Sequence, residues 1–216
     1  MIIDTPIIGL SVYRNALPEA MQIPQRLEEV LSAGKSSFFK WSDALVGDME
    51  KRKDYRDCVD FKVKRSSLSP GTESADKIIE IHDMITEKLY GCLEEFSNRY
   101  NINKLNYTEA INFVKYGPGQ HFKVHPDSGP SYQCDVSTVM YLNSDYEGGE
   151  LWFPHFDYTY LPQYGDIVLF PSTWLFSHAA LPVKSGTKYS AVTMFSYNDR
   201  YHQNHGKFTR GKSSYL

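Results

Sequence analysis

Long hydrophobic runs and a strong net charge are both missing from this sequence. No apolar stretch approaches the ~20 residues that a membrane-spanning helix needs. The first residues, Met1-Ile2-Ile3-Asp4, lack the charged segment followed by an apolar one that marks a secretory signal. The formal net charge of −3 provides no overall attraction to nucleic acids or anionic membranes. We therefore expect a cytoplasmic protein with neither a membrane nor a nucleic acid as partner.

Cysteine is also scarce. The chain has three cysteines, Cys58, Cys92 and Cys134, and no two of them are close in sequence. An odd number of widely spaced cysteines argues against a disulfide framework and against a zinc site built from thiolates. We interpret them as reduced thiols in a reducing compartment.

The 216 residues suit a single domain and are enough to bury a sizeable core. Hydrophobic residues make up 41% of the chain and aromatic residues 14%, with 16 tyrosines, a share that suits a β-rich protein with aromatic-lined pockets. Sequence repeats and low-complexity segments are absent. These properties do not indicate an oligomeric state.

The first half of the chain predicts a mixture of helices and strands. An isoleucine-rich run at 2–13 indicates a strand, and 18–33 indicates a helix that ends before a glycine. Apolar and charged residues alternate over 59–63, which is typical of a strand with one wet face. The strongest pattern lies at 74–100, where apolar residues recur every three or four positions, as in an amphipathic helix.

From residue 105 onward the pattern changes to short β-like runs separated by Gly, Pro, Asn and Asp. The runs occupy 109–116, 120–125, 136–142, 150–153, 167–170 and 188–197. Many short strands with turn signals between them favour a sandwich of the jelly-roll type. We predict one domain, with the segments 1–104 as α/β support and possible substrate loop, 105–198 as jelly-roll core, and 199–216 as a polar tail.

A candidate metal site lies in the β-rich half. In His125-Pro126-Asp127 an imidazole and a carboxylate stand at positions i and i+2, which on an extended segment point the same way, roughly 6.5–7 Å apart. A second imidazole completes the two-histidine, one-carboxylate triad typical of non-haem Fe(II) sites. His178, just after the predicted strand at 167–170, is the best candidate for that third ligand.

Other histidines compete for this role. His121 would lie ~13 Å from His125 on a strand, too far to share one ion. His155-Phe156-Asp157 repeats the same motif, but only a short stretch of chain separates it from His178. The remaining histidines are expected to pack, or to face water: His82, His202 and His205.

The order and spacing of several short segments resemble the prolyl 4-hydroxylase-like branch of the Fe(II)/2-oxoglutarate dioxygenases. The resemblance covers about 105–198 and rests on Val114-Lys115-Tyr116-Gly117-Pro118-Gly119-Gln120, His125-Pro126-Asp127, Val139-Met140-Tyr141-Leu142-Asn143, Glu147-Gly148-Gly149-Glu150-Leu151-Trp152-Phe153, Gly165-Asp166-Ile167-Val168-Leu169-Phe170-Pro171, His178, Pro182-Val183 and Gly186-Thr187-Lys188-Tyr189-Ser190. It implies an α+β, mainly β fold: a double-stranded β-helix, or jelly roll, with N-terminal supporting helices.

The resemblance also implies a set of ligands. Iron(II) would be held by His125, Asp127 and His178, with 2-oxoglutarate and O2 as cosubstrates and ascorbate as a possible reductant. Lys188, ten residues after His178, matches the family's partner for the distal carboxylate, a role that suits the strength of charge-assisted pairing. Tyr116 and Tyr141 match positions whose hydroxyls help to bind 2-oxoglutarate.

The implied reaction is hydroxylation of an unactivated carbon, with succinate and CO2 as co-products. The retained Asp127 favours hydroxylation over halogenation, since related halogenases lack this carboxylate. The resemblance favours a prolyl residue in a peptide or protein as substrate, and Trp152, Tyr55 and Arg56 are candidates for contacting it. Met194 and Phe195 in the last predicted strand depart from the family, because a tryptophan is common there.

Three alternatives stay open at this stage. The first is an oxygenase of the same fold that acts on a free amino acid, a small metabolite or an alkylated nucleobase, although Lys188 and the charge of −3 weigh against nucleic acid. The second is a non-enzymatic jelly-roll binding module, and the third is a zinc or cupin-like protein with different metal chemistry.

Overall fold

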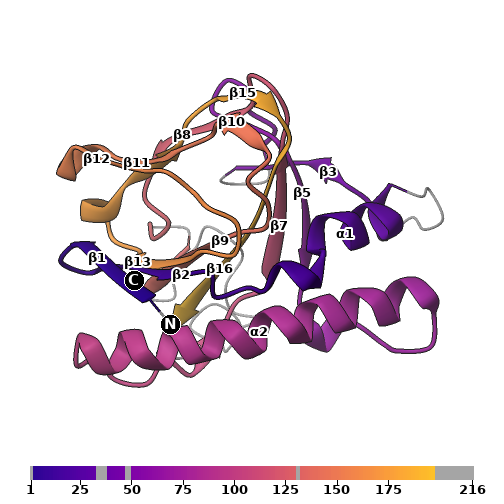
Figure 1. Cartoon of the computed structure of the whole chain (residues 1–216), viewed down its shortest axis with the longest axis horizontal. Coiled ribbons are helices and arrows are strands. Elements are labelled where there is room, and N and C mark those ends of the chain that lie inside the picture. The colour runs from indigo at the N-terminus through magenta and orange to yellow at the C-terminus, as the bar shows by residue number, and fades with distance from the viewer. Residues whose placement is uncertain (1, 33–37, 47–49, 130–131, 198–216) are drawn as a thin grey trace.

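The computed structural model describes residues 2–32, 38–46, 50–129 and 132–197. Its strands form a rolled, barrel-like layer with two α-helices against one side (Figure 1). The strands are β1 (Ile2–Ile7), β2 (Leu10–Arg14), β3 (Ser42–Asp43), β4 (Arg56–Asp57), β5 (Val59–Val63), β6 (Tyr107–Thr108), β7 (Ile111–Tyr116), β8 (His121–His125), β9 (Val136–Tyr141), β10 (Tyr146–Gly148), β11 (Leu151–Phe153), β12 (Tyr158–Tyr160), β13 (Ile167–Pro171), β14 (His178–Ala180), β15 (Val183–Gly186) and β16 (Lys188–Ser196).

The N-terminal run forms a hairpin instead of the single strand predicted for 2–13. β1 and β2 pair antiparallel on either side of Ile8-Gly9. Gly9 has φ +90, and a Cβ there would meet the Phe176 ring at 2.9 Å. The single-strand prediction was wrong because it treated 2–13 as one apolar run and overlooked Gly9, where the chain turns with a left-handed backbone.

The helix predicted at 18–33 is shorter than expected. A 3-10 turn at Glu19–Met21 precedes helix α1 (Ile23–Leu31), and Gln22 between them has φ 45, in the left-handed region. The second residue of α1 is Pro24, which suits a helix start because its missing N–H has no partner there. The chain therefore turns sharply before α1.

Helix α2 (Glu73–Arg99) confirms the helix predicted at 74–100 to within one residue at each end. Thr72 caps it, because the Thr72 hydroxyl accepts a hydrogen bond from the Ala75 amide N–H at 3.2 Å. The apolar stripe of α2 is buried against the large sheet (Figure 1).

Nine strands within the described residues form the large sheet, in the order β1-β2-β13-β9-β16-β7-β5-β3, with β6 paired to β16. The order is non-sequential, as in a double-stranded β-helix. Strands from both halves of the chain meet in this sheet, since β5 pairs with β7 in antiparallel register. Facing it are a five-stranded sheet, β12-β11-β14-β8-β4, and the ribbon β10-β15.

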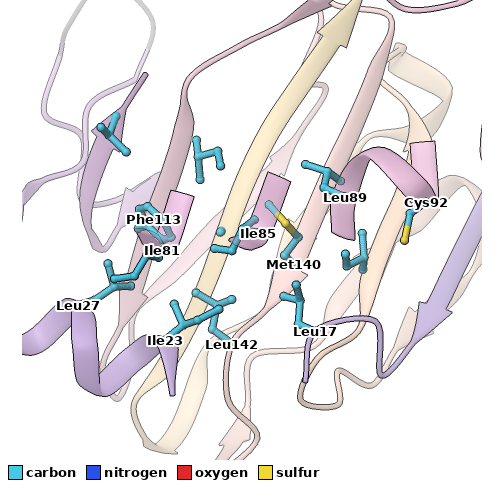
Figure 2. Close-up of a cluster of buried hydrophobic side chains, with 14 of the residues drawn as sticks. Leu17, Ile23, Leu27, Ile81, Ile85, Leu89, Cys92, Phe113, Met140 and Leu142 are labelled. Carbon is cyan, nitrogen blue, oxygen red and sulfur yellow. The ribbon is translucent and has the colours of Figure 1, made fainter. Parts of the chain in front are cut away.

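Strand alternation gives the large sheet two buried faces. Met140 of β9 lies on the helix side, in a cluster with residues of α1 and α2 such as Leu27, Ile81 and Ile85 (Figure 2). Its neighbour Tyr141 lies on the opposite face, in a second cluster with residues of the five-stranded sheet. The helices thus cover the outer face of the large sheet, and its inner face lines a cavity between the sheets.

Within the described residues, no helix combines the length and the apolar character that crossing a bilayer requires.

Candidate metal and cosubstrate site

The three residues predicted as metal ligands lie together between the sheets. One ligand atom from each of His125, Asp127 and His178 lies within 4.8 Å of the others. His125 Nε2 is 3.6 Å from Asp127 Oδ1, and His178 Nε2 is 3.8 Å from Asp127 Oδ2. Their side chains are 11%, 8% and 6% exposed, respectively. The arrangement leaves room for an ion between two imidazoles and one carboxylate.

Local backbone geometry explains the convergence. β8 ends at His125, and Pro126 keeps the chain extended into Asp127, so both side chains point the same way. His178 begins β14 and is the cross-strand partner of His125. Segments more than fifty positions apart in sequence thereby deliver their ligands to one point.

The second ring nitrogen of each histidine fixes its orientation. His125 Nδ1 lies 2.7 Å from the Lys123 carbonyl oxygen, and His178 Nδ1 lies 3.0 Å from the Phe176 carbonyl oxygen. Donation from Nδ1–H to these carbonyls leaves Nε2 as the lone-pair nitrogen facing the cluster. This is the usual support for a metal-binding histidine.

The pKa shifts favour the forms that bind metal. Burial lowers the pKa of His178 to about 4, although the Asp127 charge opposes this. Burial disfavours the ionised form of Asp127, but the two histidines outweigh it and hold its pKa well below the ordinary value. At neutral pH the cluster therefore combines a neutral imidazole with an ionised carboxylate, as ligation requires.

The competing histidines take no part. His155 and Asp157 are exposed, because His155 lies within the short 3-10 turn Pro154–Phe156 and Asp157 ends it, so the two do not share a strand face. His121 Nδ1 lies 3.2 Å from the Gly119 carbonyl oxygen, and His82 is buried in α2. His202 and His205 lie outside the described residues, as does all of the predicted tail at 199–216.

A cavity of about 360 Å³ opens beside the cluster and carries Lys188 in its lining. The Lys188 ammonium is buried, donates to the Gly149 carbonyl oxygen at 2.6 Å, and lies 5.4 Å and 5.3 Å from the ring centroids of Tyr116 and Tyr141. Burial lowers the pKa of Lys188 to about 7, against a raising influence from Glu150. All three predicted cosubstrate residues thus line one cavity.

Tyr141 supplies a test of whether this cavity suits an anionic cosubstrate. Its hydroxyl is buried and has no hydrogen-bond partner among the described residues. A buried hydroxyl without a partner costs free energy, so a bound acceptor would relieve the cost. An orphaned donor, a buried ammonium and a two-histidine, one-carboxylate cluster fit a metal chelated by a dicarboxylate.

The three residues predicted to contact substrate separate into two groups. Tyr55 and Arg56 line the cavity, and the Arg56 guanidinium lies 5.0 Å from the ring centroid of Phe122. Trp152 does not line it, because alternation along β11 turns Leu151 toward the cavity and Trp152 away.

Sequence reasoning missed other cavity residues, among them Phe122, which stacks on His125 with a 3.5 Å separation of ring centroids. It also missed Asn112 and Lys62. The place of Asn112 could have been predicted from the sequence, since it stands four positions before Tyr116 in one strand and so shares its face. The place of Lys62 could not, because it depends on which strand β5 pairs with.

Comparison with known proteins agrees with this geometry. Residues 111–196 match the 2OG-Fe(II) oxygenase superfamily. This segment is therefore similar to a 2OG-Fe(II) oxygenase domain. The matched segment begins at β7 and ends at β16, so it holds all three clustered residues and Lys188. The family description itself specifies iron and 2-oxoglutarate, for which the clustered residues and the cavity offer suitable partners.

The chain is also similar to curated proteins. A PKHD-type hydroxylase of Crocosphaera subtropica is 36% identical over 95 residues, which are 40% of this chain and 42% of the relative. A putative prolyl 4-hydroxylase of Acanthamoeba polyphaga mimivirus is 27% identical over 122 residues, 47% of this chain and 50% of the relative. The chain thus spans half or less of the length of these relatives.

Solved structures confirm the predicted jelly-roll fold. A viral collagen prolyl hydroxylase from Paramecium Bursaria Chlorella virus-1, in its 2OG complex, gives a TM-score of 0.60 at 20% identity and covers 87% of this chain and 95% of its own. A prolyl hydroxylase from Trichoplax adhaerens, in complex with a hypoxia inducible factor peptide fragment, gives 0.66 at 15% identity, covering 87% and 83%. At these identities the likeness concerns the fold.

Proposed function

We propose that this protein is an Fe(II)- and 2-oxoglutarate-dependent dioxygenase that hydroxylates an unactivated carbon, with a prolyl residue in a peptide or protein as its substrate. The observation that carries the proposal is the combination, in one cavity, of the His125, Asp127 and His178 cluster with the buried ammonium of Lys188. The names of the curated relatives, a PKHD-type hydroxylase and a putative prolyl 4-hydroxylase, support the choice of substrate.

Each residue has a defined task in the proposed reaction. His125, Asp127 and His178 would hold the metal, as two imidazoles and one carboxylate do in non-haem Fe(II) sites. Iron, 2-oxoglutarate and O2 together supply the oxidising power for C–H hydroxylation, with succinate and CO2 as co-products. Lys188 pairs with the distal carboxylate, and the Tyr141 hydroxyl donates a hydrogen bond to the same anion.

The surrounding side chains keep water out and substrate in place. Val139, Val192 and Leu151 give the cavity apolar walls beside the cluster. Such walls exclude water from a reactive centre, which limits side reactions. Tyr55 and Arg56 also line the cavity, which supports the proposal that they contact the substrate.

Retention of all three clustered residues weighs against a non-enzymatic binding module. The same residues would also bind zinc, because imidazole and carboxylate suit several divalent metals. The buried Lys188 and the Tyr141 hydroxyl, which has no partner among the described residues, favour an oxygenase that binds the dicarboxylate 2-oxoglutarate over a structural zinc site.

The proposal is tested in two stages. Anaerobic addition of Fe(II) and 2-oxoglutarate should produce a weak visible charge-transfer band. Succinate formation is then measured against a panel of proline-containing peptides, free proline and alkylated nucleotides. Succinate dependent on a proline peptide supports the proposal, whereas a band without any substrate-dependent succinate across the panel contradicts the proposed substrate. Absence of the band contradicts the cofactor assignment.

A further inference from the structure

The basic run Lys51-Arg52-Lys53 is not a free cationic surface. Lys51 and Lys53 both pair with Asp43, and Lys53 also lies 3.6 Å from Asp57. Arg52 pairs with Asp54 at 3.4 Å. Neighbouring carboxylates therefore compensate the charge of this run, so it is not available to pair with an acidic group of a substrate.

Lys62 differs from the other cations of the cavity lining in having no partner at all among the described residues. Lys188 donates to the Gly149 carbonyl oxygen, and Arg56 donates to Asp60 Oδ2 and to the Leu45 carbonyl oxygen, both at 2.9 Å. Lys62 lines the same cavity, is exposed, and has no hydrogen-bond or ion-pair partner within the described part of the chain. Its ammonium is therefore available to an incoming carboxylate.

Asn112 offers the complementary feature, an acceptor without a donor. Its Nδ2 donates to Asp60 Oδ2 at 3.2 Å, which fixes the amide so that Oδ1 faces away from Asp60. Oδ1 is buried and has no partner among the described residues. A buried acceptor left unpaired is costly, and a donor on a bound substrate would satisfy it.

These two side chains are neighbours. Lys62 of β5 and Asn112 of β7 are cross-strand partners, so their Cβ atoms are about 5 Å apart. The row continues through Val192 of β16 to Val139 of β9. All four line the cavity, and Ser137, two positions before Val139, hydrogen-bonds to Asp127. The row thus leads from the metal-ligand cluster to an acceptor and a cation.

We propose that Asn112 and Lys62 select a peptide that presents a backbone N–H and an acidic side chain beside the prolyl residue to be hydroxylated. This inference rests on the proposed function and specifies its substrate. A peptidyl proline has no N–H, so the donor to Asn112 Oδ1 comes from an adjacent residue. The acidic side chain then reaches Lys62.

A free amino acid presents similar chemistry, but the site suits it less. Lys62 is exposed at the rim, where an ion pair with a small molecule gains little. A peptide passes the rim in any case, so the contact adds selectivity to binding that other residues provide. Glu109 also lines the cavity and accepts a hydrogen bond from the Tyr107 hydroxyl, so it disfavours an acidic residue on its own side.

The test uses the full chain and peptides with a single proline that differ only in carrying Asp, Asn or Lys at each adjacent position, together with free proline. Succinate formation gives kcat/KM. The wild type should prefer the Asp peptide over the Lys peptide by about two- to fivefold, a preference that falls at high salt. Lys62→Glu should reverse it. Lys104→Glu, an exposed lysine outside the cavity lining, should leave it unchanged.

Asn112→Leu provides a second, charge-independent measurement. We expect KM for every peptide to rise by about two- to tenfold, the value of one hydrogen bond, with the anaerobic iron and 2-oxoglutarate band unchanged. That band also shows that the variant is folded.

Two outcomes overturn the inference. One is equal kcat/KM for the Asp and Lys peptides in the wild type and in Lys62→Glu. The other is turnover of free proline that exceeds turnover of every peptide. Both leave the proposed oxygenase activity intact, whereas loss of the iron and 2-oxoglutarate band in the wild type contradicts the proposed function itself.

Discussion

Lys188 and Tyr116 are cross-strand partners on β16 and β7, and the Lys188 ammonium lies 5.4 Å from the centroid of the Tyr116 ring. The Tyr141 ring lies 5.3 Å away on the neighbouring strand. Among the described residues no carboxylate lies within ion-pair distance of this buried ammonium. Lys188 is therefore held ready for an anion that the protein itself does not supply.

The affinity for 2-oxoglutarate should depend on pH through Lys188. Burial lowers the pKa of the Lys188 ammonium to about 7, so above that pH the Lys188 amine is neutral in the protein without cosubstrate. The amine must then take up a proton to pair with the anion. The dissociation constant should be nearly flat below pH 7 and rise toward tenfold per unit from pH 7 to 9. Anaerobic titration of the visible band measures it.

Lys188→Arg is the matched control for this pH dependence. A guanidinium stays protonated throughout this range, so binding should be weaker overall but flat with pH. An identical slope in wild type and Lys188→Arg would place the titrating group elsewhere.

Tyr141→Phe should move stability and cosubstrate binding in opposite directions. The variant removes a buried hydroxyl that has no partner in the free protein, so we expect the free energy of unfolding to rise by about 1 kcal/mol. Binding of 2-oxoglutarate should weaken about two- to tenfold, because the bound anion loses a donor. Denaturant unfolding and anaerobic titration measure the two effects, and a parallel change in both would contradict the assigned contact.

Loss of any one clustered residue should abolish turnover. His125→Ala, Asp127→Ala and His178→Ala each leave two ligands, too few to hold the metal in an active geometry. Substrate-dependent succinate should fall below detection in all three. His155→Ala, in the exposed repeat of the motif, should retain wild-type turnover. Full turnover by all three ligand variants would remove the basis of the metal assignment.

Gly149→Ala should weaken 2-oxoglutarate binding without touching any ligand. Gly149 has φ +66, and a Cβ there would lie 3.0 Å from Lys188 Cδ and 3.2 Å from Val183 Cγ2. The added methyl strains the turn and displaces Lys188, whose ammonium donates a hydrogen bond to the Gly149 carbonyl oxygen. KM for 2-oxoglutarate should rise several-fold while Gly91→Ala, in an open position of α2, leaves it unchanged.

Sequence reasoning predicted best where a local pattern was strong. The period of three and four residues along α2 persists over many turns, so its bounds were found almost exactly as the structure has them. The convergence of His125 and Asp127 could also be predicted, because i and i+2 on an extended segment share a face whatever the rest of the fold does.

Prediction failed where distant segments decide the outcome. The short strands β10, β12, β14 and β15 have three or four residues each, too few for a periodic signal. Whether Lys62 reaches the cavity depends on how β5 pairs with β7, which no local pattern reports. Trp152 was placed near the pocket from its sequence neighbours, whereas the alternation of β11 turns it outward.

The pairing of His125 with His178 across β8 and β14 has a consequence for folding dynamics. A metal held by both histidines would act as a clip between two strands whose ladder is short and irregular, since its register shifts between His178 and Ala180. Opening of this strand pair would require release of the ion. Backbone amides of β8 and β14 should therefore exchange hydrogen for deuterium more slowly in the metal-loaded protein, with α2 unaffected.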